Sequence, residues 1–308
     1  FTADAARRAL SGFGIAFEGS ARPVAKGVSL SLDRQIQQIC EKVADARVER
    51  GAILVSDLQS GQLCAWVSRP TYDPVQVSAY LEQGDAMLNK PLHAYCCGSV
   101  FKIVVMAAAL EMGLDVSQDY ECTGAYMVGD VSIACAKREG HGYLSGQAAF
   151  AQSCNPYFCQ LAAQVGADRL LAMAQAFGLG QSPDLGYGLE SKAGQLPQRR
   201  DLTSPVALAN LAIGQGDLQV TPLQVLRMAA IVANNGCDES MHLFERIIDA
   251  DGKVQNLVTS KTSRRVISEQ TAAQLRDMMV ETVLSGSGRP AAASVYQSAV
   301  KTSSAETG

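Results

Sequence analysis

The sequence predicts a mixed α/β (α+β) fold, in which helices flank an antiparallel sheet and an all-α subdomain is inserted between its strands. Strand-like segments stand near both ends of the chain, while the hydrophobic spacing between them is mostly helical. The 308 residues suffice for one large domain or two smaller ones. A composition of 47% hydrophobic and 18% charged residues is typical of an ordered globular protein.

The first predicted elements are a helix and a hairpin. DRQIQQICEKVADAR (33–47) has apolar residues at helical spacing, which predicts one buried face made of Ile36, Ile39, Cys40, Val43 and Ala44. GAILVSD (51–57) and QLCAWVS (62–68) are separated by a short turn and predict two paired strands. Residues 1–27 contain Gly and Pro interruptions, so we expect a linker or the remnant of a preceding domain there, and the main domain over 28–308.

The rest of the chain is predicted to form a loop, then a helical region, and then a C-terminal part that contains both strands and a helix. Residues 70–100 are loop-like, and helical patterns run from Ser99 to about residue 235. HLFERIID (242–249), DGK and VQNLV predict a second hairpin. A helix is expected over 268–284, followed by a strand in ASVYQSAVK (293–301).

Charge and hydropathy exclude some partners. The net charge is −4 and basic residues cluster only in pairs, so we expect no nucleic-acid partner. No run of 18 apolar residues occurs, and the chain starts at Phe1 without an initiator methionine or signal peptide. We therefore expect a portion of a longer protein, with any membrane anchor upstream.

The nine cysteines form an odd set without a CxxC pair. This spacing argues against a structural metal site, and most of the thiols are expected to be small buried hydrophobes. Cys122 and Cys135 bracket a glycine-containing loop and are the candidate disulfide pair.

Lys102 is the only polar residue between Val100 and Leu110, and Ser99 stands three positions before it. Residues i and i+3 share a helix face, so the lysine can lie beside the serine. A desolvated lysine loses its proton near neutrality and can act as a general base toward a serine nucleophile at a helix N-terminus. The alternative is a lysine that snorkels to solvent.

Two further motifs are weak when taken alone. Ser153-Cys-Asn155 interrupts an apolar segment, and it is equally compatible with a capping serine and a turn asparagine. Lys301-Thr302-Ser303 closes the predicted strand, where a charged residue is common at an exposed edge.

The ordered set Ser99-x-x-Lys102, Ser153-x-Asn155 and Lys301-Thr302-Ser303 resembles the three motifs of the penicillin-binding proteins. Flanking segments such as GAILVSDLQSGQLCAWVSRPTYDP and AIGQGDLQVTPLQVLRMAAIVANNG are similar to the transpeptidase domain of class B members, over about residues 28 to 308. The resemblance implies the penicillin-binding/serine β-lactamase-like fold. It also implies acyl transfer on peptidoglycan stem peptides, without metal or cofactor, and acylation by β-lactam antibiotics.

The resemblance also implies a role for each residue of the motifs. Ser99 would be the nucleophile and Lys102 its base. Ser153 would relay a proton to the leaving amine, and Asn155 would bind the substrate's peptide. Lys301 would hold positive charge beside Ser153. Thr302 would help bind the terminal carboxylate of the substrate, and Ser303 would line the groove in which the substrate lies. The backbone N–H groups of Ser99 and Ser304 would form the oxyanion hole.

The family setting further implies a place and a partner in the cell. Class B proteins are anchored to the bacterial cell membrane through an N-terminal segment, with the domain on its extracytoplasmic face. They work beside a membrane glycosyltransferase. Elongation, division and sporulation all stay open as roles.

The sequence departs from the family pattern at three points. Ser303 stands where glycine is usual, and its side chain is expected to narrow the substrate groove and reduce activity. Cys97 and Val100 replace proline and threonine near the nucleophile. The chain stops at Gly308, soon after the third motif, so the C-terminal strands of the family are expected to be missing from it.

Three other functions would use part of the same residue pattern. A class A β-lactamase needs a Glu-x-x-x-Asn pattern, which the chain lacks. A D,D-carboxypeptidase would use the same residues with water as the acceptor. A non-catalytic β-lactam-binding sensor or scaffold is supported by the altered third motif.

Overall fold

The computed structural model describes residues 27–81, 84–183, 185, 189, 191–249, 251–257 and 262–304. They form two compact units, which we describe separately. The smaller consists of residues 27–30 and 244–257, and the larger holds the others. The predicted linker at 1–27 lies outside the described residues except for Gly27.

The smaller unit is a three-stranded antiparallel sheet with the order β1-β9-β10. Its strands are β1 (Gly27–Leu30), β9 (Phe244–Ile248) and β10 (Val254–Asn256). The Asp249 carboxylate accepts the backbone N–H groups of Asp251 and Lys253, at 3.0 and 2.8 Å, and so closes the turn between β9 and β10. The hairpin predicted from HLFERIID-DGK-VQNLV is confirmed.

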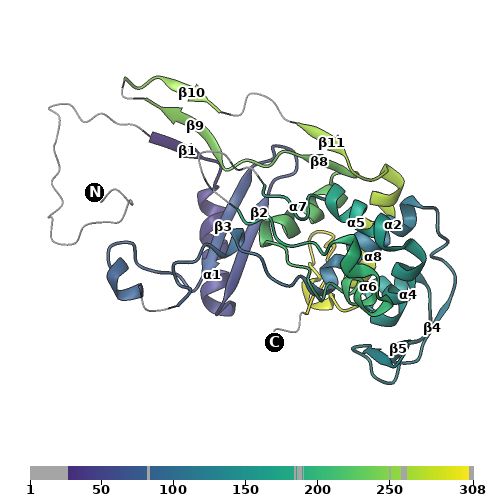
Figure 1. Cartoon of the computed structure of the whole chain (residues 1–308). Helices are drawn as coiled ribbons and strands as arrows, with labels where there is room; N and C mark the ends of the chain where they lie inside the picture. Colours follow the sequence, from purple (N-terminus) through teal and green to yellow (C-terminus); the bar gives the residue numbers. More distant parts are fainter. Residues whose placement is uncertain are drawn as a thin grey trace. The chain divides into compact units, whose positions relative to one another are not determined.

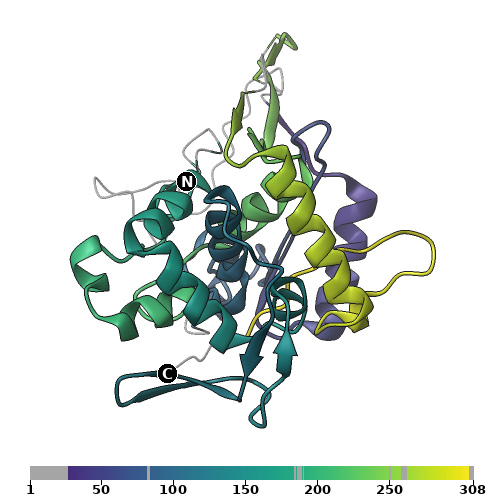
Figure 2. The same cartoon turned by 90° about the vertical axis from the view of Figure 1, so that its right-hand side faces the viewer.

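The larger unit combines helices with short antiparallel ribbons (Figures 1 and 2). Its helices are α1 (Arg34–Arg47), α2 (Lys102–Glu111), α3 (Gly146–Ala151), α4 (Asn155–Val165), α5 (Ala167–Ala176), α6 (Pro205–Ala212), α7 (Pro222–Ala233) and α8 (Glu269–Leu284). Its strands are β2 (Gly51–Ser56), β3 (Leu63–Arg69), β4 (Tyr120–Cys122), β5 (Ala125–Val128), β6 (Val131–Ala134), β7 (Gly142–Leu144), β8 (Cys237–Glu239) and β11 (Ser263–Arg265). They pair as β2-β3, β4-β7, β5-β6 and β8-β11. The predicted mixed α/β class is confirmed. Among the described residues, no helix is long and apolar enough to cross a membrane.

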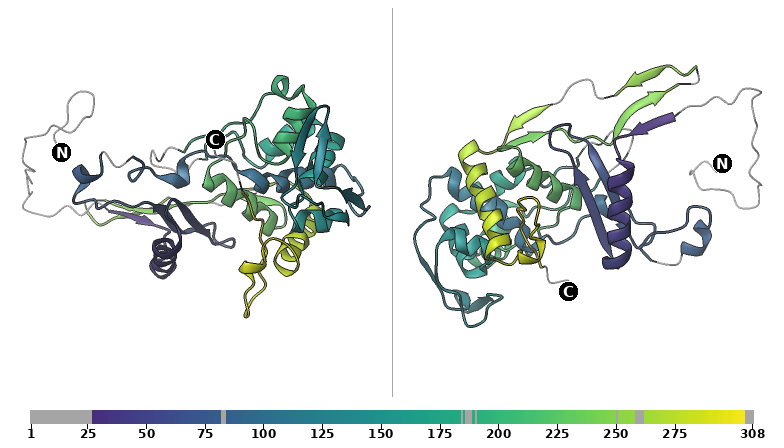
Figure 3. Two further views of the ribbon diagram at one scale, coloured as in Figure 1. Left: turned by 90° about the horizontal axis from the view of Figure 1, so that it is seen from below. Right: turned by 180° about the vertical axis from the view of Figure 1, so that it is seen from behind.

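Helix α1 packs on the β2–β3 hairpin, as both panels of Figure 3 show. Asp33 caps the helix by accepting the N–H groups of Gln35 and Ile36 at 2.9 Å. The predicted helix and hairpin are therefore confirmed, but the predicted buried face of α1 is too wide. Only Cys40 and Ala44 are buried, while Ile39 and Val43 are 61% and 49% exposed. The hairpin covers one side of the helix, and these two residues lie about 100° further round it.

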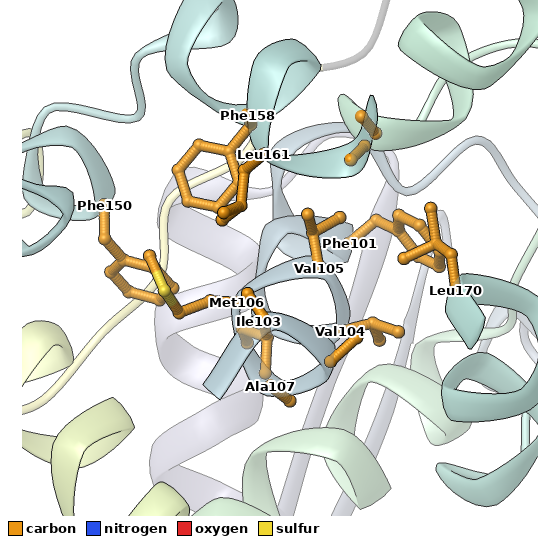
Figure 4. Packing of buried hydrophobic residues seen from close by; sticks show 14 of the residues in the cluster. Phe101, Ile103, Val104, Val105, Met106, Ala107, Phe150, Phe158, Leu161 and Leu170 are labelled. Atoms are coloured by element: carbon orange, nitrogen blue, oxygen red, sulfur yellow. The ribbon is translucent and has the colours of Figure 1, made fainter. Parts of the chain in front are cut away.

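Helix α2 forms the centre of the hydrophobic core (Figure 4). Eight of its ten residues are buried, and α4, α5 and α8 pack around it. A helix that is apolar on all sides needs neighbours on all sides, because each large aliphatic side chain that is fully buried contributes about 1.5–3 kcal/mol. The core therefore fixes the helix that carries Lys102.

Two other predictions of secondary structure are wrong. The helical reading of 99–235 missed strands β4 to β7, which have three or four residues each and are too short to show a period. ASVYQSAVK is an irregular segment in the structure. A strand needs a partner for its backbone groups, and no described strand pairs with this segment. Its Val300 N–H instead donates to the Met279 carbonyl at 3.0 Å.

Candidate active site

Ser99 lies in the short 3-10 helix η3 (Gly98–Phe101), which leads directly into α2. Gly98 adopts a left-handed φ of 55°, and its N–H donates to the Gly214 carbonyl at 3.0 Å. Ser99 is half-buried and lines an open groove of about 730 Å³. As a residue of the first turn, it has a backbone N–H without an acceptor inside the helix.

Lys102 is fully buried, and all three N–H groups of its ammonium donate hydrogen bonds to acceptors in the second motif. Its Nζ donates to the Ser153 carbonyl at 2.6 Å, to Ser153 Oγ at 3.1 Å and to Asn155 Oδ1 at 2.7 Å. Three donated bonds are the full capacity of an ammonium group, so this geometry is that of protonated lysine. Within the described residues, Ser99 Oγ has no hydrogen bond to Lys102.

Burial opposes the charged form of Lys102. Desolvation lowers its pKa from the usual range to about 8, although the three acceptors and the Phe158 ring, 5.4 Å from Nζ, favour the ammonium. The lowered pKa makes the neutral amine accessible near neutral pH. A base for Ser99 is available near neutrality once the amine turns its lone pair toward the hydroxyl.

Ser153 and Asn155 flank the turn between α3 and α4. Ser153 adopts φ 54°, a left-handed conformation that costs about 1–3 kcal/mol in a residue other than glycine. Asn155 bridges two elements, because its Nδ2 donates to the Ala134 carbonyl at 2.9 Å while its Oδ1 accepts from Lys102. Cys154, rather than Ser153, is the N-cap residue of α4, so the capping alternative for Ser153 does not hold.

Lys301 approaches Ser153 from the other side. Its Nζ donates to Ser153 Oγ and to the Thr302 carbonyl, both at 3.0 Å, and lies 5.5 Å from the Phe150 ring centre. Desolvation lowers the pKa of Lys301 to about 7, with a smaller contribution from the charge of Lys102. Neither lysine has a carboxylate partner in the part of the chain that is described.

The third-motif segment lies across η3. The Ser303 hydroxyl donates to the Cys97 carbonyl, and the Thr302 hydroxyl shares a hydrogen bond with that of Ser287. A Cβ atom at Gly98 would stand 2.5 Å from the Ser304 carbonyl oxygen, so glycine is required where the two segments touch. This contact sets Ser303 and Ser304 beside Ser99.

The groove unites the three motifs. Ser99, Ser153, Asn155, Thr302, Ser303 and Ser304 line it. Lys102 and Lys301 meet these residues through Ser153. The motifs in the sequence did not reveal the polar lining residues that other segments contribute: Ser132, Arg138, Gln152, Asn210, Gln215 and Ser287.

One side-chain cluster beside the site could hold a metal ion. The ligand atoms of Cys122, Cys135, His141 and Cys154 all lie within 4.8 Å of one another. Cys122 and Cys135, the candidate disulfide pair, are both free thiols, which corrects that prediction. Their sulfurs face a third thiol and an imidazole as well as each other.

Comparison with known proteins identifies the family of the chain. The family described as "Penicillin binding protein transpeptidase domain" matches residues 51–308. The chain therefore belongs to the transpeptidase domains of the class B penicillin-binding proteins.

Named relatives and solved structures share most of the chain. Peptidoglycan D,D-transpeptidase PbpA of Mycolicibacterium smegmatis is 33% identical over 283 residues, or 84% of this chain and 56% of the relative. Stage V sporulation protein D of Bacillus subtilis is 30% identical over 298 residues, or 91% of this chain and 44% of the relative. Penicillin-binding protein A of M. tuberculosis, solved as a ceftriaxone acyl-enzyme complex, superposes with a TM-score of 0.84 at 27% identity, over 92% of this chain and 68% of that one. The chain spans about half the length of the curated relatives that it matches.

Proposed function

We propose that this chain is the catalytic part of a peptidoglycan D,D-transpeptidase, with residues 28–308 as its transpeptidase domain and 1–27 as a linker or the remnant of a preceding domain. The observation that carries the proposal is the convergence of two lysines, Lys102 buried and Lys301 half-buried, on the Ser153 hydroxyl, in the groove that Ser99 lines. Three segments that are far apart in the sequence meet there, which is the arrangement an activated serine needs.

The first half-reaction is acylation. Ser99 Oγ attacks the carbonyl of the penultimate D-alanine of a stem peptide, and its proton passes to the neutral amine of Lys102. The C–N bond then breaks, and the terminal D-alanine leaves with a proton that it receives through Ser153. The acyl group stays on Ser99 as an ester.

The second half-reaction transfers the acyl group to an amine of a neighbouring stem peptide. That amine attacks the ester carbonyl and loses a proton to Lys102, and Ser99 recovers its hydroxyl. The products are a cross-linked peptide and free enzyme. A β-lactam would stop at the first half, because its ring opens on Ser99 and no leaving group departs.

The surrounding groups bind charge as it develops. The backbone N–H groups of Ser99 and Ser304 would hold the oxyanion of the tetrahedral intermediate. Lys301 and Thr302 would bind the substrate's terminal carboxylate, while Asn155 would hold its peptide group. These residues form a preorganised polar wall, so little reorganisation is needed during the reaction.

The place of action and the partner follow from the same proposal. We assign the domain to the extracytoplasmic face of a bacterial membrane, attached through an N-terminal segment that precedes this chain. Its partner would be a membrane glycosyltransferase that supplies the glycan strands. The names of the relatives, which include a sporulation protein and cell-wall transpeptidases, support this setting.

Intact-protein mass spectrometry after incubation with benzylpenicillin tests the proposal. We expect one stable adduct on the chain and none on Ser99→Ala. Cys237→Ser is the control that should keep the adduct, because this half-buried thiol lies at β8, outside the groove lining. A folded chain without an adduct would contradict the proposal and would favour the non-catalytic sensor.

A D,D-carboxypeptidase shares the acylation step and differs in the acceptor. The distinction needs a stem-peptide substrate together with an acceptor amine. Cross-linked product identifies a transpeptidase, whereas a shortened peptide alone identifies a carboxypeptidase.

A further inference from the structure

Three cysteines and one histidine gather beside the groove, which Cys135 also lines, in a cluster that the proposed reaction does not use. Their four ligand atoms lie within 4.8 Å of one another, and the three thiols are nearly inaccessible to solvent. Cys135 Sγ and His141 Nδ1 are 3.5 Å apart. In a tetrahedral zinc site the bond lengths place a sulfur and a nitrogen ligand about 3.6 Å apart and two sulfurs about 3.8 Å apart. The cluster therefore needs only small side-chain rotations to enclose an ion.

Separate turns of the β4–β7 and β5–β6 ribbons bring these residues together. Cys122 ends β4 and pairs with Gly142 of β7, next to His141. Cys135 follows β6, and its N–H donates to the Gly124 carbonyl at 2.8 Å. Cys154 comes from a different element, the N-terminus of α4. The ligands therefore converge from both ribbons and a core helix.

Glycine makes this convergence possible at two positions. A Cβ atom at Gly124 would lie 2.0 Å from the Arg138 carbonyl oxygen, and one at Gly140 would lie 2.2 Å from that of Cys122. Both residues also have left-handed φ values, of 99° and 86°. The backbone is thus packed tightly around the cluster, as it is around sites with fixed ligand geometry.

We propose that Cys122, Cys135, His141 and Cys154 form a structural Zn²⁺ site that anchors the second motif of the active site. Three sulfurs and one imidazole are the donors of a closed structural zinc site, and binding converts three thiols to thiolates with release of their protons. A disulfide between any two of the cysteines would leave the third thiol and the imidazole unused.

The expected consequence lies at Ser153 and Asn155. Cys154 stands between these two residues, so a metal bond to its sulfur holds the turn on which Ser153 adopts its left-handed conformation. The same turn supplies all three acceptors of Lys102. A Zn(Cys)₃His centre has a net charge of −1, which offsets the two ammonium groups that meet at Ser153 without a carboxylate. The effect on acylation rests on the proposed function, whereas metal binding does not.

Metal analysis of the full chain tests the binding itself. Protein purified from zinc-supplemented medium without chelator should contain about one equivalent of zinc by inductively coupled plasma mass spectrometry. Cys135→Ser and His141→Ala should reduce this content to the background level. Cys159→Ala is the matched control, since Cys159 is a buried thiol on α4 outside the cluster, and it should keep the metal.

Cobalt substitution removes the dependence on variants that fold poorly. Metal-stripped wild-type protein titrated with Co²⁺ should develop the visible bands of a tetrahedral ion and thiolate-to-cobalt charge transfer, saturating at one equivalent. Folded wild-type protein that binds neither metal would overturn the site. A mass two units lower, with Cys122 and Cys135 in one disulfide-linked peptide, would overturn it as well.

Acylation by benzylpenicillin tests the positioning role. Removal of zinc from the wild type should slow the chemical step roughly 10- to 100-fold, since loss of a group that orients a functional side chain has about this effect, and re-addition of Zn²⁺ should restore the rate. One bound zinc with an unchanged rate after removal overturns the positioning role while the site stands. One bound zinc with no acylation in either state instead contradicts the proposed function.

Discussion

Gly214 gives the sharpest test of how the nucleophile is positioned. It adopts φ 75°, and a Cβ atom there would stand 1.9 Å from the carbonyl oxygen of Gly98, the residue before Ser99. Real Cβ atoms almost never approach a neighbour within 3.0 Å, so Gly214→Ala must separate the two segments by about 1 Å. The change therefore moves Ser99 without touching its side chain.

The expected cost has two parts. Alanine in the left-handed region costs about 1–2 kcal/mol, and overpacking against a backbone atom costs about 1–3 kcal/mol. Gly214→Ala should therefore lower the free energy of unfolding by about 2–5 kcal/mol. A displacement of 1 Å at a reacting group costs on the order of 10²-fold in rate, so acylation of Ser99 should slow by about that factor.

Gly113→Ala separates the two parts. Gly113 has nearly the same φ, 71°, but it lies outside the groove lining and no atom lies within 4 Å of its Cβ position. It should therefore cost only about 1–2 kcal/mol and leave Ser99 in place. Urea unfolding and benzylpenicillin labelling measure both quantities. Equal losses in the two variants would refute the contact between Gly214 and Gly98 as the cause.

Three other predictions concern the site itself. The acylation rate should pass through a maximum between about pH 7 and 8. It rises as Lys102 (pKa about 8) becomes neutral and falls as Lys301 (pKa about 7) loses the charge that holds the carboxylate. Lys301→Arg should abolish the falling limb, and a pH-independent rate from 6 to 9 would contradict both roles. Ser303→Gly should raise the acylation rate because it removes a side chain from the groove, and an unchanged rate would show that Ser303 does not restrict it. Asn155→Ala should lower the free energy of unfolding by about 1–3 kcal/mol, since it leaves buried partners unpaired. The exposed Gln152→Ala should change it by less than about 0.5 kcal/mol in the same urea titration.

Local patterns in the sequence predicted the elements whose signal is local. The apolar surroundings of Lys102 predicted its burial, and the helical spacing of Ile36, Cys40 and Ala44 predicted α1. The exposure of Ile39 and Val43 was not predictable, because it depends on which side of α1 the hairpin covers.

Features that depend on distant contacts were harder to predict. The two lysines meet at Ser153 through the packing of α2, α4 and the third-motif segment. Only the resemblance to a known family suggested that these two lysines lie close together. The cysteine cluster was missed because a CxxC pattern detects ligands within one turn. Here Cys122, Cys135 and Cys154 come from separate turns, and no single stretch of sequence contains the site.

The Ser153 hydroxyl accepts hydrogen bonds from both Lys102 and Lys301. A hydroxyl oxygen has two lone pairs, so both are occupied and its single hydrogen must point away from both amines. Because Ser153 lines the groove, the direction left for that hydrogen is toward whatever molecule lies there. In the proposed reaction this hydrogen therefore points at the leaving group before any substrate arrives, and its delivery requires no rotation of the serine side chain.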